Sequence, residues 1–201
     1  MDNLILLFQA PPLALQLVID GILVGAMFAL AAYGMALVWG VMNIINIAQG
    51  EFVILGGFVA YFVDAAGFST FLGIPVAAVA LFVLGYVLYR LVIFRLVDRD
   101  LFISILATFG LSILLQQLMN ELFGADVRIV DTHLDSWFFA DNLITVSQIR
   151  VVAFMLTIII AAVLVLFMRY SRLGQAIRAT AQNARAARIL GIDTDRVYAM
   201  T

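Results

Sequence analysis

Four polar side chains interrupt an otherwise apolar stretch, GVMNIINIAQGEF at residues 40–52. They are Asn43, Asn46, Gln49 and Glu51. The flanking residues are so apolar that this stretch is expected at membrane depth, where polar groups are costly unless they face a cavity or the protein interior. Neutral amides there can hydrogen-bond a passing solute, or they can satisfy backbone groups where a helix breaks. Both interpretations stay open, and all four residues are candidates for a substrate path.

The composition places the chain in a membrane. Of its 201 residues, 65% are hydrophobic and 12% are charged, and the mean hydropathy is +1.13. A soluble domain does not tolerate so much apolar surface. The sequence has no cysteine and one histidine, so it predicts neither disulfides nor a metal site. It contains no catalytic triad and no phosphate-binding glycine loop, so we expect no catalytic residue and no cofactor.

The elements that must position the polar cluster are membrane-spanning helices. A span needs about 20 apolar residues, and the chain contains five such stretches, at 13–39, 44–64, 74–94, 101–123 and 147–168. This pattern predicts an all-α, polytopic transmembrane helical bundle.

The second span is expected to be broken. Gly50 weakens a helix, and Glu51 suits the positive end of the half-helix that would follow. Asn46 or Gln49 would then cap exposed N–H groups. A continuous helix would instead place Asn43, Asn46 and Gly50 on one stripe.

Arginine is distributed unevenly along the chain, and this predicts its orientation. Arg90, Arg95 and Arg99 lie at the end of the third span and in its connection to the fourth, and six more arginines lie in 169–196. Nine of the eleven basic residues therefore fall on one side. Loops rich in basic residues stay in the cytoplasm. The 124–142 loop, which carries Trp137 and two phenylalanines suited to a membrane interface, then faces outward. We expect a multi-pass protein of the cell inner (plasma) membrane with an external N-terminus.

The basic segment 169–196 predicts two short helices on the cytoplasmic surface. Leu173 and Ile177 mark an apolar face of the first, and alanines crowd the second. Anionic lipid could hold such helices at the interface. Alternatively they form a docking element, because alanine-rich faces allow close insertion into a partner. Gly191 is the expected C-terminal cap of the second helix, and Asp193 or Thr194 can cap another that begins near Val197.

Three stretches together resemble a known family. They are YGMALVWGVMNIINIAQGEFVILGGFVAY at 33–61, ILATFGLSILLQ at 105–116 and RYSRLGQAIRATAQNARAARILGIDTDRVYAMT at 169–201. In this order they resemble the permease subunits of branched-chain amino acid ABC importers, the LivH-type family. The resemblance covers most of 21–201. It implies a membrane-spanning subunit that moves branched-chain or other hydrophobic amino acids and is not itself an enzyme, because ATP is hydrolysed in separate subunits.

The resemblance also implies partners. These are ATP-binding cassette subunits, a second permease subunit and an external substrate-binding protein, together with membrane lipid but no nucleic acid. The segment 169–196 resembles the coupling segment that seats in the ATP-binding subunit. Its candidate coupling residues are Gly174, Arg178, Ala187, Arg188, Leu190 and Gly191, and an Ala-x-x-Leu-Gly element falls on the third, fifth and sixth of them. Such permeases continue for several more spans, so we expect this chain to be the N-terminal part of a longer one.

Two other functions are open on the sequence alone. A urea or short-amide permease of the same wider family needs much the same lining. An ion-driven secondary transporter would instead require charge pairs inside the membrane, and Glu51 is the only strong candidate for one.

The predicted orientation can be tested by thiol labelling in intact cells, because the chain has no cysteine of its own. Cysteine at Ser136 should react with a reagent that cannot cross the membrane, and cysteine at Asn183 should react only after permeabilisation. Labelling in the reverse pattern would overturn the orientation and, with it, the cytoplasmic placement of 169–196.

Overall fold

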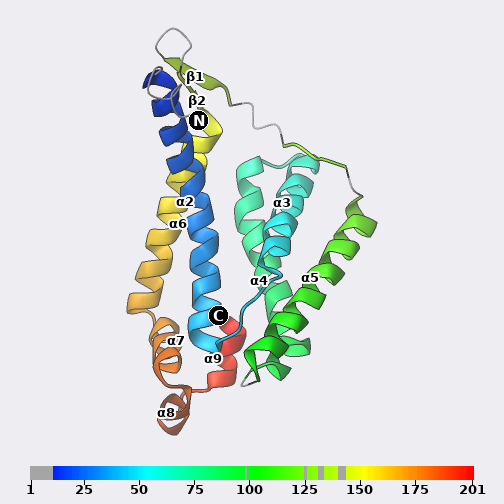
Figure 1. The fold of residues 1–201 in the computed structure, drawn as a ribbon, viewed down its shortest axis with the longest axis vertical. Coiled ribbons are helices and arrows are strands. Elements are labelled where there is room, and N and C mark those ends of the chain that lie inside the picture. The colour runs from blue at the N-terminus through cyan, green and yellow to red at the C-terminus, as the bar shows by residue number, and fades with distance from the viewer. Residues whose placement is uncertain (1–10, 98, 125, 131–133, 140–143) are drawn as a thin grey trace, which may run out of the picture. The chain divides into compact units, whose positions relative to one another are not determined.

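The computed structural model describes residues 11–97, 99–124, 126–130, 134–139 and 144–201, and these are predominantly helical (Figure 1). The helices longer than fifteen residues are α2 (Pro11–Met42), α3 (Gln49–Ala65), α4 (Gly73–Leu91), α5 (Leu101–Phe123) and α6 (Gln148–Tyr170). The shorter elements are η1 (Thr70–Leu72), η2 (Ile93–Arg95), β1 (Ser136–Phe139), β2 (Ile144–Ser147), α7 (Arg172–Gln182), α8 (Ala184–Ile189) and α9 (Thr194–Met200). The expected external N-terminus falls on residues 1–10, which lie outside the described residues.

Four helical stretches among the described residues are long and apolar enough to cross a membrane. They are Pro12–Met42, Thr70–Arg95, Leu101–Phe123 and Gln148–Tyr170. The predicted polytopic helical class is therefore confirmed. α3, which occupies most of the expected span 44–64, is shorter at 17 residues. Residues 43–48 before it are not helical, so the break lies ahead of Gly50, which sits in the first turn of α3.

Contacts divide the chain into two compact units, which we describe separately. The first unit comprises residues 1–32 and 131–166, and the second comprises 33–130 and 167–201. In the first unit, β1 and β2 form an antiparallel hairpin that leads directly into α6. Each strand has only four residues. So short an alternation does not distinguish a strand from a loop, and the sequence therefore does not predict this hairpin.

In the second unit, α3 and α4 pack closely against each other. A Cβ added at Gly73 would lie 2.9 Å from the Cα of Ala60, so this contact needs a glycine. A ring cluster follows on the other side of α3, where Phe58 and Phe62 both meet Phe123 of α5, with ring centroids 4.6 and 5.2 Å apart. These contacts hold α3, α4 and α5 together.

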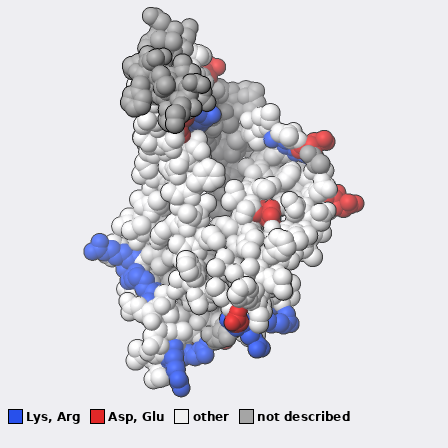
Figure 2. Space-filling model, viewed as in Figure 1, with Lys and Arg blue, Asp and Glu red and all other residues white. Residues whose placement is uncertain are grey.

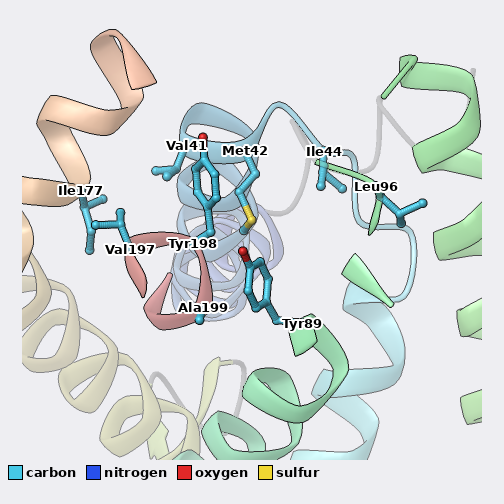
Figure 3. Close-up of a cluster of buried hydrophobic side chains, with 9 residues drawn as sticks. All are labelled: Val41, Met42, Ile44, Tyr89, Leu96, Ile177, Val197, Tyr198 and Ala199. Atoms are coloured by element: carbon cyan, nitrogen blue, oxygen red, sulfur yellow. The ribbon is translucent and has the colours of Figure 1, made fainter. Parts of the chain in front are cut away.

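The main hydrophobic core of the second unit joins the end of α2 to the last helices of the chain (Figure 3). Its buried members are Val41, Met42, Ile44, Tyr89, Leu96, Ile177, Val197, Tyr198 and Ala199. Val41 and Met42 end α2, and Ile44 follows it. Tyr89 belongs to α4 and Leu96 follows η2, while the other members come from α7 and α9. The basic segment 169–196 therefore packs against the other helices of this unit through Ile177, and the residues of α9 extend the same contact.

Candidate functional site

Asn43 ends α2. Its backbone φ is +54°, and it is the one non-glycine residue with positive φ in the described part of the chain. Asparagine tolerates this left-handed conformation better than most residues do. Its backbone N–H donates to the carbonyl of Trp39 at 2.8 Å, and its Oδ1 accepts from the Trp39 indole Nε1 at 3.1 Å. The side chain is thus engaged at the helix end, and it does not line the cavity described below.

Asn46 orders the turn between the break and α3. Its Oδ1 accepts a hydrogen bond from the backbone N–H of Ala48 at 3.1 Å, two residues further on. This is the local pattern by which asparagine stabilises turns. The residue at the N-cap position is Ala48, which offers no capping side chain. We expected Asn46 or Gln49 to cap exposed N–H groups at this break. Asn46 does accept from such a group, the N–H of Ala48, whereas Gln49 is the first residue of α3.

Thr108 of α5 satisfies the broken backbone. Its hydroxyl donates to the carbonyl of Ile45 at 2.9 Å and accepts from the N–H of Ile47 at 3.3 Å. The side chain is completely buried. Sequence reasoning assigned no role to this residue, although it lies within ILATFGLSILLQ. The available signal was a run of hydroxyls at spacings of four, Ser104, Thr108 and Ser112, along one face of an apolar helix.

Glu51 is held by the same face of α5. It lies in the first turn of α3, where the helix dipole favours a negative charge. Its Oε1 accepts a hydrogen bond from the hydroxyl of Ser112 at 2.6 Å. The carboxylate is therefore turned toward α5, and it is not among the residues that line the cavity.

A cavity of about 320 Å³ lies beside the break. Its polar lining includes the amides of Asn46 and Gln49 and the hydroxyl-bearing rings of Tyr86 and Tyr89. The remaining walls are largely apolar side chains of α4, α9 and the end of α2, together with Tyr198 and Thr201. None of the described residues that line the cavity is an aspartate, glutamate or arginine. A concave, mostly apolar space with a few polar groups is typical of sites for small molecules. The structure thus brings together two of the four predicted residues and leaves Asn43 and Glu51 outside.

Tyr89 adds a polar group that the sequence did not single out. It is only 4% exposed, and its hydroxyl has no hydrogen-bond partner among the described residues. Figure 3 shows this hydroxyl directed toward the side chain of Met42, another residue of the cavity wall. A buried hydroxyl without a partner is costly, so a polar group that entered the cavity near it would be favoured.

Four of the six candidate coupling residues stabilise the fold of the segment 169–196 itself. A Cβ on Gly174 would lie 2.5 Å from the carbonyl oxygen of Met168, so the turn from α6 into α7 requires glycine. Gly191 has φ +84°, and its N–H donates to the carbonyl of Arg188 while that of Ile192 donates to Ala187. This pair of bonds is the Schellman cap expected at the end of α8. Arg188 in turn donates from Nε to the hydroxyl of Thr194 at 2.7 Å, joining α8 to α9.

Ala187 does not lie on an exposed docking face. Its side chain is 2% exposed, because the cap folds the chain back over α8. The exposed apolar side chains here are instead Ile189 and Leu190, at 81% and 80%. Arg178 is also exposed. Asp193 caps α9 by accepting from the N–H of Arg196 at 3.1 Å, and the helix begins at Thr194, earlier than expected.

Basic side chains gather at one end of the second unit. Figure 2 shows blue side chains around the end where Figure 1 labels α7 and α8. Ile93 of η2 and Leu96 after it pack in the same cluster as Ile177 of α7. They belong to the last turn of α4, to η2 and to the segment from the end of α6 to α9. The two sets that the sequence assigned to one side of a membrane therefore lie at one end of this unit.

Comparison with known proteins identifies relatives. The family described as "Branched-chain amino acid transport system / permease component" matches residues 17–201. The high-affinity branched-chain amino acid transport system permease protein LivH of Escherichia coli is 30% identical over 93% of this chain, as is LivH of Salmonella typhimurium. BraD of Pseudomonas aeruginosa, which has the same description, is 26% identical over 93% of the chain. This chain spans 65% of the length of each of these relatives. No solved structure is significantly similar to it.

Replacing Thr108 tests whether its hydroxyl sustains the break. Thr108→Val keeps the shape but leaves the N–H of Ile47 and the carbonyl of Ile45 without this partner, which should cost about 1–3 kcal/mol. Thr108→Ser keeps the hydroxyl and should lose only about the 0.8 kcal/mol of one methyl group. Thermal unfolding of the purified protein in detergent should rank the melting temperatures as wild type, Ser, Val. A valine variant as stable as the serine variant would contradict the role.

Proposed function

Because the chain belongs to the family of branched-chain amino acid transport permease components, we propose that it forms part of the membrane-spanning subunit of an ABC importer. The proposed substrates are branched-chain or other hydrophobic amino acids. Membership of a permease family supports a role in the membrane component of a transporter and not as an enzyme. ATP hydrolysis is assigned to a separate partner subunit.

The cavity beside the broken helix is the observation that supports this substrate class. Its walls are largely apolar, which suits an aliphatic side chain. The amides of Asn46 and Gln49 can accept from an ammonium group and donate to a carboxylate, so they can serve both ends of a zwitterion. A fixed charge in the lining would bind one of these ends too strongly for release. We therefore assign the path to Asn46 and Gln49.

The alternatives draw less support from the geometry. Urea and short amides have no aliphatic side chain that could contact the apolar walls of the cavity. An ion-driven transporter needs charge pairs within the membrane, yet Glu51 is hydrogen-bonded to a hydroxyl instead of a cation. The described ion pair between spanning helices, Asp20 with Arg150 at 2.6 Å, has partly exposed side chains and lies in the first turns of α6.

The exposed tip of α8 is the proposed contact with the ATP-binding subunit. Ile189 and Leu190 form an apolar projection on an otherwise basic segment, and the cap at Gly191 and the bond from Arg188 to Thr194 fix it in place. A rigid projection loses little conformational entropy when it binds. In this arrangement Gly174, Ala187, Arg188 and Gly191 support the projection, while Leu190 and the exposed Arg178 are available to the partner.

We assign this end of the second unit to the cytoplasm, on the inner membrane. The gathering of arginines there supports the assignment, because basic residues near the ends of spans are retained inside. A second permease subunit and an external substrate-binding protein complete the proposed transporter.

The path assignment predicts separate effects for two neighbouring amides. Gln49→Leu should slow uptake about fivefold, the equivalent of one hydrogen bond of about 1 kcal/mol, without lowering the melting temperature. Asn43→Gly should transport normally, because glycine retains the positive φ and Asn43 lies outside the cavity. Uptake of leucine per assembled transporter in proteoliposomes measures both. Equal uptake by wild type and Gln49→Leu would remove Gln49 from the path.

The docking assignment likewise separates Leu190 from Ala187. Leu190→Asp should reduce the ATP hydrolysis that the loaded binding protein stimulates by about tenfold, as for a central interface residue. Its stability should change by less than about 0.5 kcal/mol, because the side chain is exposed. Ala187→Trp should instead destabilise the protein by about 1–3 kcal/mol, because the site is filled. If Leu190→Asp is stimulated normally, the tip of α8 is not the docking point.

A further inference from the structure

The β1–β2 hairpin of the first unit has one wholly apolar face. Its register pairs Trp137 with Val146 and Phe139 with Ile144. Residues that face each other across two strands lie on the same side of the sheet, and alternate residues point to opposite sides. Trp137, Phe139, Ile144 and Val146 therefore share one side, which we call the aromatic face. The opposite side carries Ser136, Phe138, Thr145 and Ser147.

The aromatic face is open in this unit. Trp137 is 47% exposed and Phe139 is 53% exposed, while Phe138 on the opposite side is 61% exposed. The aromatic face is therefore distinguished by its four apolar side chains and not by its exposure. Large aromatic side chains that remain this exposed in a folded element point to a surface that something apolar covers.

A polar network fixes the hairpin to two spanning helices. The side-chain amide of Gln16 on α2 donates to the carbonyl of Thr145 at 2.8 Å and accepts from its N–H at 2.7 Å. It thereby occupies backbone groups that β2 presents at its outer edge. The same amide donates to Asp20 at 2.9 Å, and Asp20 accepts from Arg150 of α6 at 2.6 Å. The position of the hairpin along α2 and α6 is therefore defined.

The lengths of these helices place the hairpin at the boundary of the bilayer. The candidate span Gln148–Tyr170 has 23 residues, about 35 Å at 1.5 Å per residue, only slightly more than a hydrocarbon core of about 30 Å. Its first residues must therefore lie at the boundary, where the Arg150–Asp20 pair can reach headgroups. β2 ends at Ser147, directly before this helix, and the N–H of Gln148 donates to the carbonyl of Asp135 at 3.2 Å. One end of each strand thus adjoins the start of this helix.

We propose that the aromatic face of the β1–β2 hairpin lies in the lipid interface and anchors this end of α2 and α6 in the bilayer. Tryptophan is enriched at this depth because its ring is both apolar and able to hydrogen-bond. The opposite side of the hairpin, which carries three hydroxyl groups, then faces water. Phe138 is the one ring on that side. The polar backbone of β2 can approach lipid because Gln16 satisfies groups at its edge.

Spin labels on alternate residues of β1 test this placement in the complete transporter, reconstituted into phosphatidylethanolamine and phosphatidylglycerol vesicles. Cysteines are introduced one at a time as Ser136→Cys, Trp137→Cys, Phe138→Cys and Phe139→Cys, with any cysteine elsewhere in the transporter replaced. Collision with oxygen, which partitions into lipid, is compared with collision with a water-soluble nickel chelate. Labels at 137 and 139 should collide preferentially with oxygen, and labels at 136 and 138 with nickel.

Two results would overturn the proposal. Preferential collision with nickel at all four positions would mean that the aromatic face is in water. Protection of 137 and 139 from both reagents would mean that protein covers this face, as an external binding protein or second subunit would. Gln16→Leu provides an internal control, because a hairpin released from α2 should lose the alternation between neighbouring positions. A hairpin that keeps its alternation in this variant would show that the network does not set its depth.

Discussion

Every backbone N–H and C=O at membrane depth needs a partner from the protein itself, and this requirement shapes the second unit of the structure. Helices meet it internally, so a break in a helix creates donors and acceptors that other groups must satisfy. Between α2 and α3 the hydroxyl of Thr108 serves two of these groups, and the side chain of Asn46 serves a third. Once the break is supported in this way, the backbone can stay non-helical beside the cavity.

The four polar residues of 43–51 have different roles at this break. Asn43 closes one helix, Asn46 begins the turn to the next, and Glu51 lies against Ser112 at the start of α3. The side-chain amide of Gln49 makes no hydrogen bond with a described residue, and Gln49 lines the cavity. Its amide is therefore the one most available to a solute, which is why we assign it the clearest part in the proposed path.

In the segment 169–196, the residues that stabilise the fold also differ from those that are exposed for contact with a partner. Glycines at 174 and 191 shape the turns, Ala187 fills the interior, and Arg188 joins two helices. Because α9 contributes Val197, Tyr198 and Ala199 to the same core as Met42 and Tyr89, the proposed docking segment shares its packing with the wall of the cavity. The bond from Arg188 to Thr194 joins α8 to α9, and α9 belongs to this core, so the proposed docking segment and the proposed path are physically connected.

The sequence by itself determined the class of the protein, most of the helices and the family. These properties follow from apolar runs of sufficient length and from local motifs, which act over one element at a time. The caps at Gly191 and Asp193 were equally predictable, because capping depends on residues only a few positions apart. The sequence also showed that the second span breaks, but it placed the break near Gly50, since it could not reveal that Thr108 would support an earlier one. The partner of Glu51 and the hairpin held by Gln16 depend on contacts between residues far apart in the chain. Such contacts are decided only when helices pack, because side chains of one type can face a cavity, a neighbour or lipid according to what lies beside them.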